Sequence, residues 1–160
     1  MVFLTFVMLN RGETCLLRAK TLKEMKKKGS ISDFTALRNR ELLASFRDVL
    51  ATSRGVPLRD MFGLAVKRPA SRFWVSEYRA AEVICAMLRG ETIGNQLPQR
   101  KAMYDEIYRR VVEWRRENPG RPVSDAVTAV VNSAAPEFYL TEKSAKVIIY
   151  YYCPLNFFRF

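Results

Sequence analysis

Two copies of one short stretch, Phe73-Trp74-Val75-Ser76-Glu77 and Phe138-Tyr139-Leu140-Thr141-Glu142, stand 65 residues apart in this chain. In each copy an aromatic connector leads to Ser or Thr, which cap helix N-termini well, and then to Glu, which suits the positive first turn. The pair therefore predicts that one helix begins near Ser76 and an equivalent helix near Thr141.

The same offset extends outward without a gap, so that Leu42–Ile84 repeats as Ile107–Ile149. The turn Gly55-Val56-Pro57-Leu58-Arg59-Asp60 becomes Gly120-Arg121-Pro122-Val123-Ser124-Asp125, and the apolar positions keep their character. Unrelated amphipathic helices share their apolar stripes by chance, but they do not also share a turn and a helix start at one offset. We therefore predict a mainly α-helical chain that contains one three-helix unit twice.

Apolar residues recur at three- and four-residue steps in the predicted helices, which is the spacing of an amphipathic helix. In the first copy the first helix ends at Gly55, which suits a C-terminal cap, and the next two helices cover 57–67 and 76–89. In the second copy the corresponding two helices cover 122–131 and 141–151.

These patterns divide the chain into five segments. They are an N-terminal strand or hairpin with a basic arm (1–33), a first three-helix unit (34–90), a polar linker (91–99), a second unit (100–152) and an aromatic tail (153–160). The apolar run at 1–9, a turn and the residues 14–18 predict a short β-hairpin. The run at 1–9 lacks a preceding basic region and is too short for a bilayer, so we expect no signal peptide and no membrane partner.

The net charge of +11 arises from 27 Lys and Arg against 16 Asp and Glu. Such a surplus raises the local concentration of polyanions, of which nucleic acid is the commonest and an acidic membrane surface the second. The alternative is a basic surface without such a partner. The segment 20–28 alone holds five Lys and one Glu.

The chain lacks the residues that several classes of activity require. The chain has no histidine, and Cys15, Cys85 and Cys153 are too scattered for a zinc site or a disulfide framework, which suits a reducing cytoplasm. There is no phosphate-binding Gly-rich loop, and the recurring Asp60 and Asp125 are explained by their place in a first helical turn. We expect no cofactor, no metal and no catalysis.

The second and third helices of each unit, joined by a fixed connector, resemble the layout of helix-turn-helix DNA readers. The resemblance covers both units, but the connector 68–75 is longer than the turn of about three or four residues in that motif. The chain as a whole is similar to small uncharacterised proteins of bacterial phages and mobile elements. The similarity to these proteins implies no defined activity, whereas the helix-turn-helix-like layout implies a regulator or accessory factor that binds nucleic acid, DNA more readily than RNA.

A reading helix needs exposed polar residues in its first turns and cations that hold phosphates beside it. The expected nucleic-acid contacts are Lys67, Arg68, Arg72, Ser76, Tyr78, Arg79, Lys143 and Lys146. Because Glu137 replaces Arg72 in the second copy, the first copy is the better candidate. The alternative is a non-catalytic helical adaptor for phage or mobile-element assembly. Its aromatic residues between 150 and 160 would pack on the N-terminal region, on a second subunit or on a protein partner.

Overall fold

A computed structural model describes residues 31–94 and 96–152 of the chain. These residues form six α-helices and no strand, so the prediction of a mainly α-helical protein is confirmed. The helices are α2 (Ile31–Thr52), α3 (Leu58–Val66), α4 (Glu77–Leu88), α5 (Pro98–Glu117), α6 (Val123–Val131) and α7 (Glu142–Tyr152). Helix α2 begins three residues before the predicted boundary at 34. The predicted β-hairpin, the basic arm at 20–28 and the tail at 153–160 lie outside the described residues.

The helix ends follow the local sequence signals. The Ser76 hydroxyl accepts a hydrogen bond from the backbone amide three residues later at 3.2 Å, and the Thr141 hydroxyl does the same at 3.1 Å. Both residues therefore cap the helices that the repeated stretch predicts. Gly55 and Gly120, which follow α2 and α5, have φ angles of 78° and 81°, a left-handed conformation that favours glycine.

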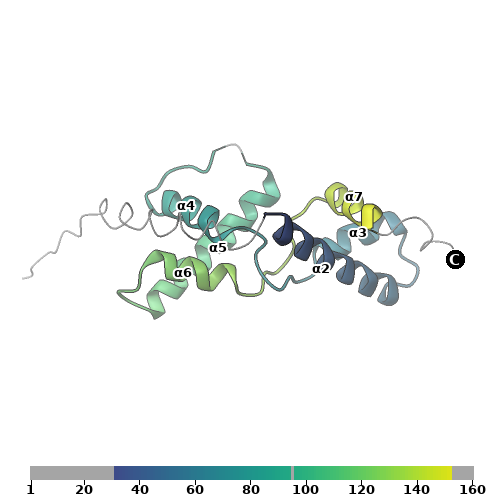
Figure 1. Cartoon of the computed structure of the whole chain (residues 1–160), viewed down its shortest axis with the longest axis horizontal. Coiled ribbons are helices and arrows are strands. Elements are labelled where there is room, and N and C mark those ends of the chain that lie inside the picture. Colours follow the sequence, from purple (N-terminus) through teal and green to yellow (C-terminus); the bar gives the residue numbers. More distant parts are fainter. Residues whose placement is uncertain (1–30, 95, 153–160) are drawn as a thin grey trace, which may run out of the picture.

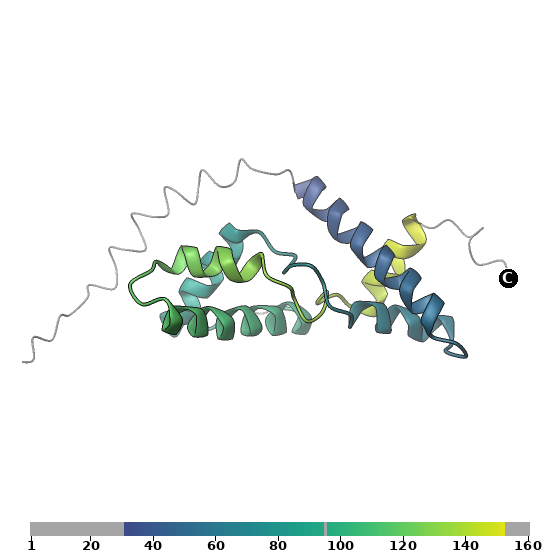
Figure 2. The ribbon, with the colours of Figure 1, turned by 90° about the horizontal axis from the view of Figure 1, so that it is seen from below.

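The six helices form two groups of three that are not consecutive in sequence (Figure 1). Helices α2 and α3 pack with α7, and helices α5 and α6 pack with α4. The groups therefore do not coincide with the expected consecutive units 34–90 and 100–152, because α4 and α7 each pack on the first two helices of the other segment. Figure 2 shows the same two groups along the long axis of the molecule, with the connecting segments between them.

The connectors before α4 and α7 cross between the groups and bind each other. Their backbone hydrogen bonds come in pairs related by the offset of 65 residues. These bonds run from Ala70 N to Ala135 O and from Ala135 N to Ala70 O (both 2.9 Å), from Phe73 N to Val131 O (3.1 Å) and from Phe138 N to Val66 O (3.0 Å). At the crossing, the buried alanines Ala70 and Ala135 therefore bond their backbone amide and carbonyl groups to each other, so that none of these groups is left unpaired.

The apolar core runs through both groups and through the crossing. Leu42 and Ile107, which the repeat makes equivalent, are both fully buried, as is Phe73 in the first connector. Tyr139 holds a φ of 52°, which is uncommon for a residue other than glycine, and its ring stacks on Phe73 with centroids 6.1 Å apart. Among the described helices, none is long and apolar enough to cross a membrane.

Candidate nucleic-acid interface

The crossing connectors divide the predicted contact residues between the two helix groups. Lys67 and Arg68 follow α3, and Lys143 and Lys146 lie on α7, so these four belong to the α2–α3–α7 group. Ser76 caps α4, which carries Tyr78 and Arg79, and α4 belongs to the other group. The side chains predicted to flank one reading helix therefore lie in two separate bundles. Helix α3 packs with α7 and not with α4, which alters the predicted helix-turn-helix pairing.

Two of the predicted arginines form ion pairs with carboxylates of the fold. The Arg68 guanidinium lies 3.6 Å from the Asp48 carboxylate and donates a hydrogen bond to the Thr52 hydroxyl at 3.4 Å. Arg79 binds Glu82 at 2.7 Å, and this hydrogen bond raises the pKa of the arginine. Both pairs are partly exposed, so each contributes about 1 kcal/mol or less to stability. They also reduce the positive charge that these arginines offer to a phosphate.

Arg72 is a packing residue more than a free surface cation. Its guanidinium lies over the Phe34 ring, 5.1 Å from the centroid, and Phe34 meets Trp74 edge-on with centroids 5.1 Å apart. The Arg72 Nε atom is buried and has no hydrogen-bond partner. Ser76 uses its hydroxyl oxygen for the α4 cap, and Tyr78 is half-buried.

The remaining predicted residues, Lys67, Lys143 and Lys146, are all exposed, and we call them the lysine cluster. The end of α3 meets the start of α7, because a Cβ placed on Gly63 would come within 2.5 Å of the Glu142 carboxylate. Lys67 lies one helical turn after Gly63 and therefore at the end of the bundle where α7 begins. The Lys146 ammonium lies 5.8 Å from the Tyr150 ring centroid.

Lys143 occupies a position that helix stability does not favour. It is the second residue of α7, where the helix dipole presents positive charge. Glu142 beside it is the residue that the dipole favours. The position of Lys143 suits the binding of an anion, because helix N-termini and cations both attract phosphate.

The sequence ahead of α2 carries much of the net positive charge. Residues 1–30 contain seven of the 27 basic residues and two of the 16 acidic residues, so nearly half of the net charge of +11 precedes the helices. Helix α2, into which this segment leads, packs with α3 and α7. Much of the positive charge therefore precedes, in the sequence, the first helix of the group that carries the lysine cluster.

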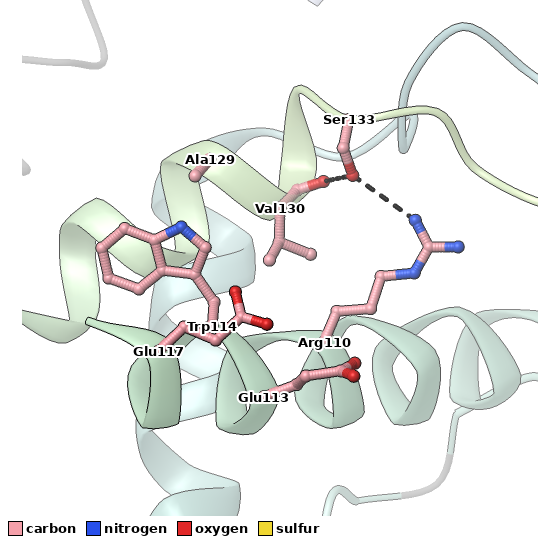
Figure 3. A pocket seen from close by; sticks show the side chains of 7 residues that line it. All are labelled: Arg110, Glu113, Trp114, Glu117, Ala129, Val130 and Ser133. Carbon is pink, nitrogen blue, oxygen red and sulfur yellow. Dashed lines mark hydrogen bonds between the residues drawn. The ribbon is translucent and has the colours of Figure 1, made fainter. Parts of the chain in front are cut away.

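Sequence reasoning missed a groove of about 210 Å³ between α5 and α6 (Figure 3). Within the groove, the Trp114 ring and the carboxylates of Glu113 and Glu117 come from the same helix, with both carboxylates to one side of the ring in Figure 3. The i, i+4 spacing of these two glutamates around a tryptophan is a signal that the sequence carries.

No protein family, curated protein or solved structure matches this chain. Among the residues that the structure describes, no three His, Cys, Asp or Glu side chains come together as metal ligands would. The features of the molecule that bear on its function are the charge and the exposed surfaces of the two helix groups.

Proposed function

We propose that this protein binds nucleic acid, with duplex DNA the favoured ligand, through the α2–α3–α7 group. The observation that carries the proposal is the lysine cluster at the end of that group, with Lys143 placed against the helix dipole of α7. The five lysines of 20–28, just ahead of α2, would add phosphate contacts. Arg68, Arg72 and Arg79 contribute less, because each already contacts a carboxylate or an aromatic ring.

We also infer that the chain is one three-helix unit present twice, with the third helices exchanged. The repeat makes α4 and α7 equivalent, and the hydrogen bonds of the crossing connectors obey the same offset. In this arrangement the helix-turn-helix-like pairs form across the copies, α3 with α7 and α6 with α4. Helix α7 then has the place of a reading helix and carries Lys143 and Lys146.

Salt-dependent binding tests the nucleic-acid proposal. Fluorescence anisotropy of a labelled DNA duplex should give a dissociation constant that weakens steeply with salt. The variant K67Q/K143Q/K146Q should flatten the slope of log affinity against log salt by about 0.9 for each lysine that no longer neutralises a phosphate, hence by up to about 2.7.

The matched control removes the same charge from the other group, in the variant R100Q/R115Q/R116Q, whose three arginines are exposed on α5. This control should keep most of the binding. If duplex and single strands both fail to bind at low salt, the proposal is wrong. If the two triple variants weaken binding equally, net charge alone attracts the ligand and the lysine cluster is not the interface.

A second function, a non-catalytic adaptor that binds a protein partner, is favoured by the outer surface of α7. Val147 and Tyr151 lie one turn apart on this helix and are 68% and 80% exposed, and Tyr152 is also exposed. Exposed apolar side chains at this spacing suit a helix-in-groove contact. A defined oligomer in light scattering that V147S/Y151S dissociates, with no nucleic acid in the 260/280 nm absorbance ratio, would favour the adaptor.

A further inference from the structure

The groove between α5 and α6 has an aromatic side and two carboxylates. Trp114, Glu113 and Glu117 contribute from α5, and Val130 and Ser133 contribute from α6 and its C-terminal end (Figure 3). Arg110 also lines it, but its guanidinium is held by Glu106 at 2.6 Å and by the Ala134 carbonyl at 2.7 Å.

At the equivalent positions on α2 and after α3, the chain carries an arginine. The offset of 65 residues maps Ser133 onto Arg68, Glu113 onto Asp48 and Glu117 onto Thr52. The Arg68 guanidinium lies against both of those equivalents, 3.6 Å from the Asp48 carboxylate and 3.4 Å from the Thr52 hydroxyl. At these equivalent positions the chain therefore supplies its own guanidinium.

The α5–α6 groove lacks that arginine and has stronger acceptors for one. The Ser133 hydroxyl donates to the Val130 carbonyl at 2.7 Å and accepts a hydrogen bond from the Arg110 guanidinium at 3.4 Å, so it pairs with neither carboxylate. Two carboxylates replace the one carboxylate and one hydroxyl at the equivalent positions of α2, and Trp114 replaces the buried Val49. Glu113 meets Arg109 at 3.5 Å, whereas Glu117 forms no ion pair with any described residue.

We propose that the α5–α6 groove binds an arginine side chain that a peptide of a protein partner presents. A guanidinium can pair with the Glu117 carboxylate through two parallel N–H donors and can stack on the Trp114 ring. Lysine fits less well, because its ammonium is a compact point charge without a planar face. This site lies in the opposite helix group from the lysine cluster and does not depend on nucleic-acid binding.

Nuclear magnetic resonance can test the groove directly, because the chain has only two tryptophans, Trp74 and Trp114. The full ¹⁵N-labelled protein is titrated with the blocked peptide Gly-Gly-Arg-Gly-Gly, and the two indole N–H signals are followed. The Trp114 signal should move and saturate, while the Trp74 signal should stay in place. The same peptide with citrulline for arginine, which keeps the shape and loses the charge, should leave both signals unchanged.

Two variants assign the effect to the groove. E117Q should weaken peptide binding about tenfold, because a charge-assisted hydrogen bond becomes a neutral one. S133R restores the arginine of the other half and should occupy the groove from within, so that the peptide no longer binds. S133Q, whose new side chain is long but uncharged, should still bind the arginine peptide. Circular dichroism checks that each variant folds.

Three results would overturn the proposal. The first is binding of the citrulline peptide as strong as that of the arginine peptide. The second is a Trp114 shift that both E117Q and S133R leave unchanged. The third is a shift of Trp114 when the protein alone is diluted, because a second copy of the chain would then be the occupant.

Discussion

Phe73 offers the sharpest test of the crossed architecture, through the variant F73A. Its side chain is fully buried in the connector that leads from the α2–α3–α7 group to α4. Loss of a buried phenylalanine destabilises a protein by about 3–5 kcal/mol, which is a large part of the roughly 5–15 kcal/mol that holds a typical domain together. We therefore expect F73A to lose at least about a fifth of its free energy of unfolding.

The equivalent variant F138A makes the prediction quantitative. Phe138 is also buried, at 3% exposure. The Arg110 guanidinium lies 5.1 Å from the Phe73 ring centroid. The residue 65 positions before Arg110 is Ser45, which has no charge to offer the Phe138 ring. A cation–π contact contributes about 0.5–1 kcal/mol, so F73A should be more destabilising than F138A by that amount. The comparison is internal, because both variants make the same chemical change.

Urea unfolding supplies the measurement. Tryptophan fluorescence reports on the connector through Trp74 and on α5 through Trp114, and far-ultraviolet circular dichroism reports on all helices. Because the connectors join both groups, the two probes should give one coincident transition in the parent protein and in both variants. A loss below about 1 kcal/mol in F73A, or separate transitions for the two groups, would refute the crossed core.

The helix caps, Tyr139 and the exchanged helices each give a further prediction. T141A should lose about 1 kcal/mol of stability, as should S76A, because each removes the hydroxyl that caps a helix; thermal unfolding measures both. Burial raises the pKa of Tyr139 to about 12, above its unfolded value near 10, so the stability that this residue contributes is complete below pH 10 and is lost as the pH rises towards 12. Urea midpoints between pH 9 and 12 should therefore fall more steeply in the parent protein than in Y139F. Fragments 1–94 and 95–160, when expressed together, should copurify as a complex, since each supplies the third helix of the other group; separately folded monomers would contradict the exchange.

The positions of the helices could be predicted from the sequence because they depend on local chemistry. The caps at Ser76 and Thr141 and the turn glycines Gly55 and Gly120 act within a few residues of themselves, so their types and spacing predict where the helices end. The candidate site could be predicted from the sequence only in part. Exposure of the lysine cluster follows from its place off the apolar stripe, and the pairing of Arg79 with Glu82 is an i, i+3 relation visible in the sequence. The Arg68–Asp48 pair joins residues on different elements, so the sequence alone does not reveal it.

The exchange of α4 and α7 could not be predicted, because the repeat makes the two possible partners of each helix alike. Glu77 of α4 accepts hydrogen bonds from Thr128 and Asn132, which belong to α6 and its end. The equivalent contact places Glu142 against Gly63 of α3. In a consecutive arrangement the same two contacts would form with the glutamates interchanged, so these polar contacts favour neither arrangement.

The connectors are what distinguish the two arrangements, since only crossed connectors bring Ala70 and Ala135 together. Their reciprocal hydrogen bonds would have no counterpart in two separate units. The exchange that we infer would also explain how the copies could diverge, because each group contains one helix from the other segment of the chain. A change at one position, such as Arg68 to Ser133, therefore alters one groove and leaves its equivalent intact. A chain built this way can keep one scaffold while its two helix groups differ in the ligands proposed for them, with the lysine cluster beside the start of α7 in one group and the Trp114 groove between α5 and α6 in the other.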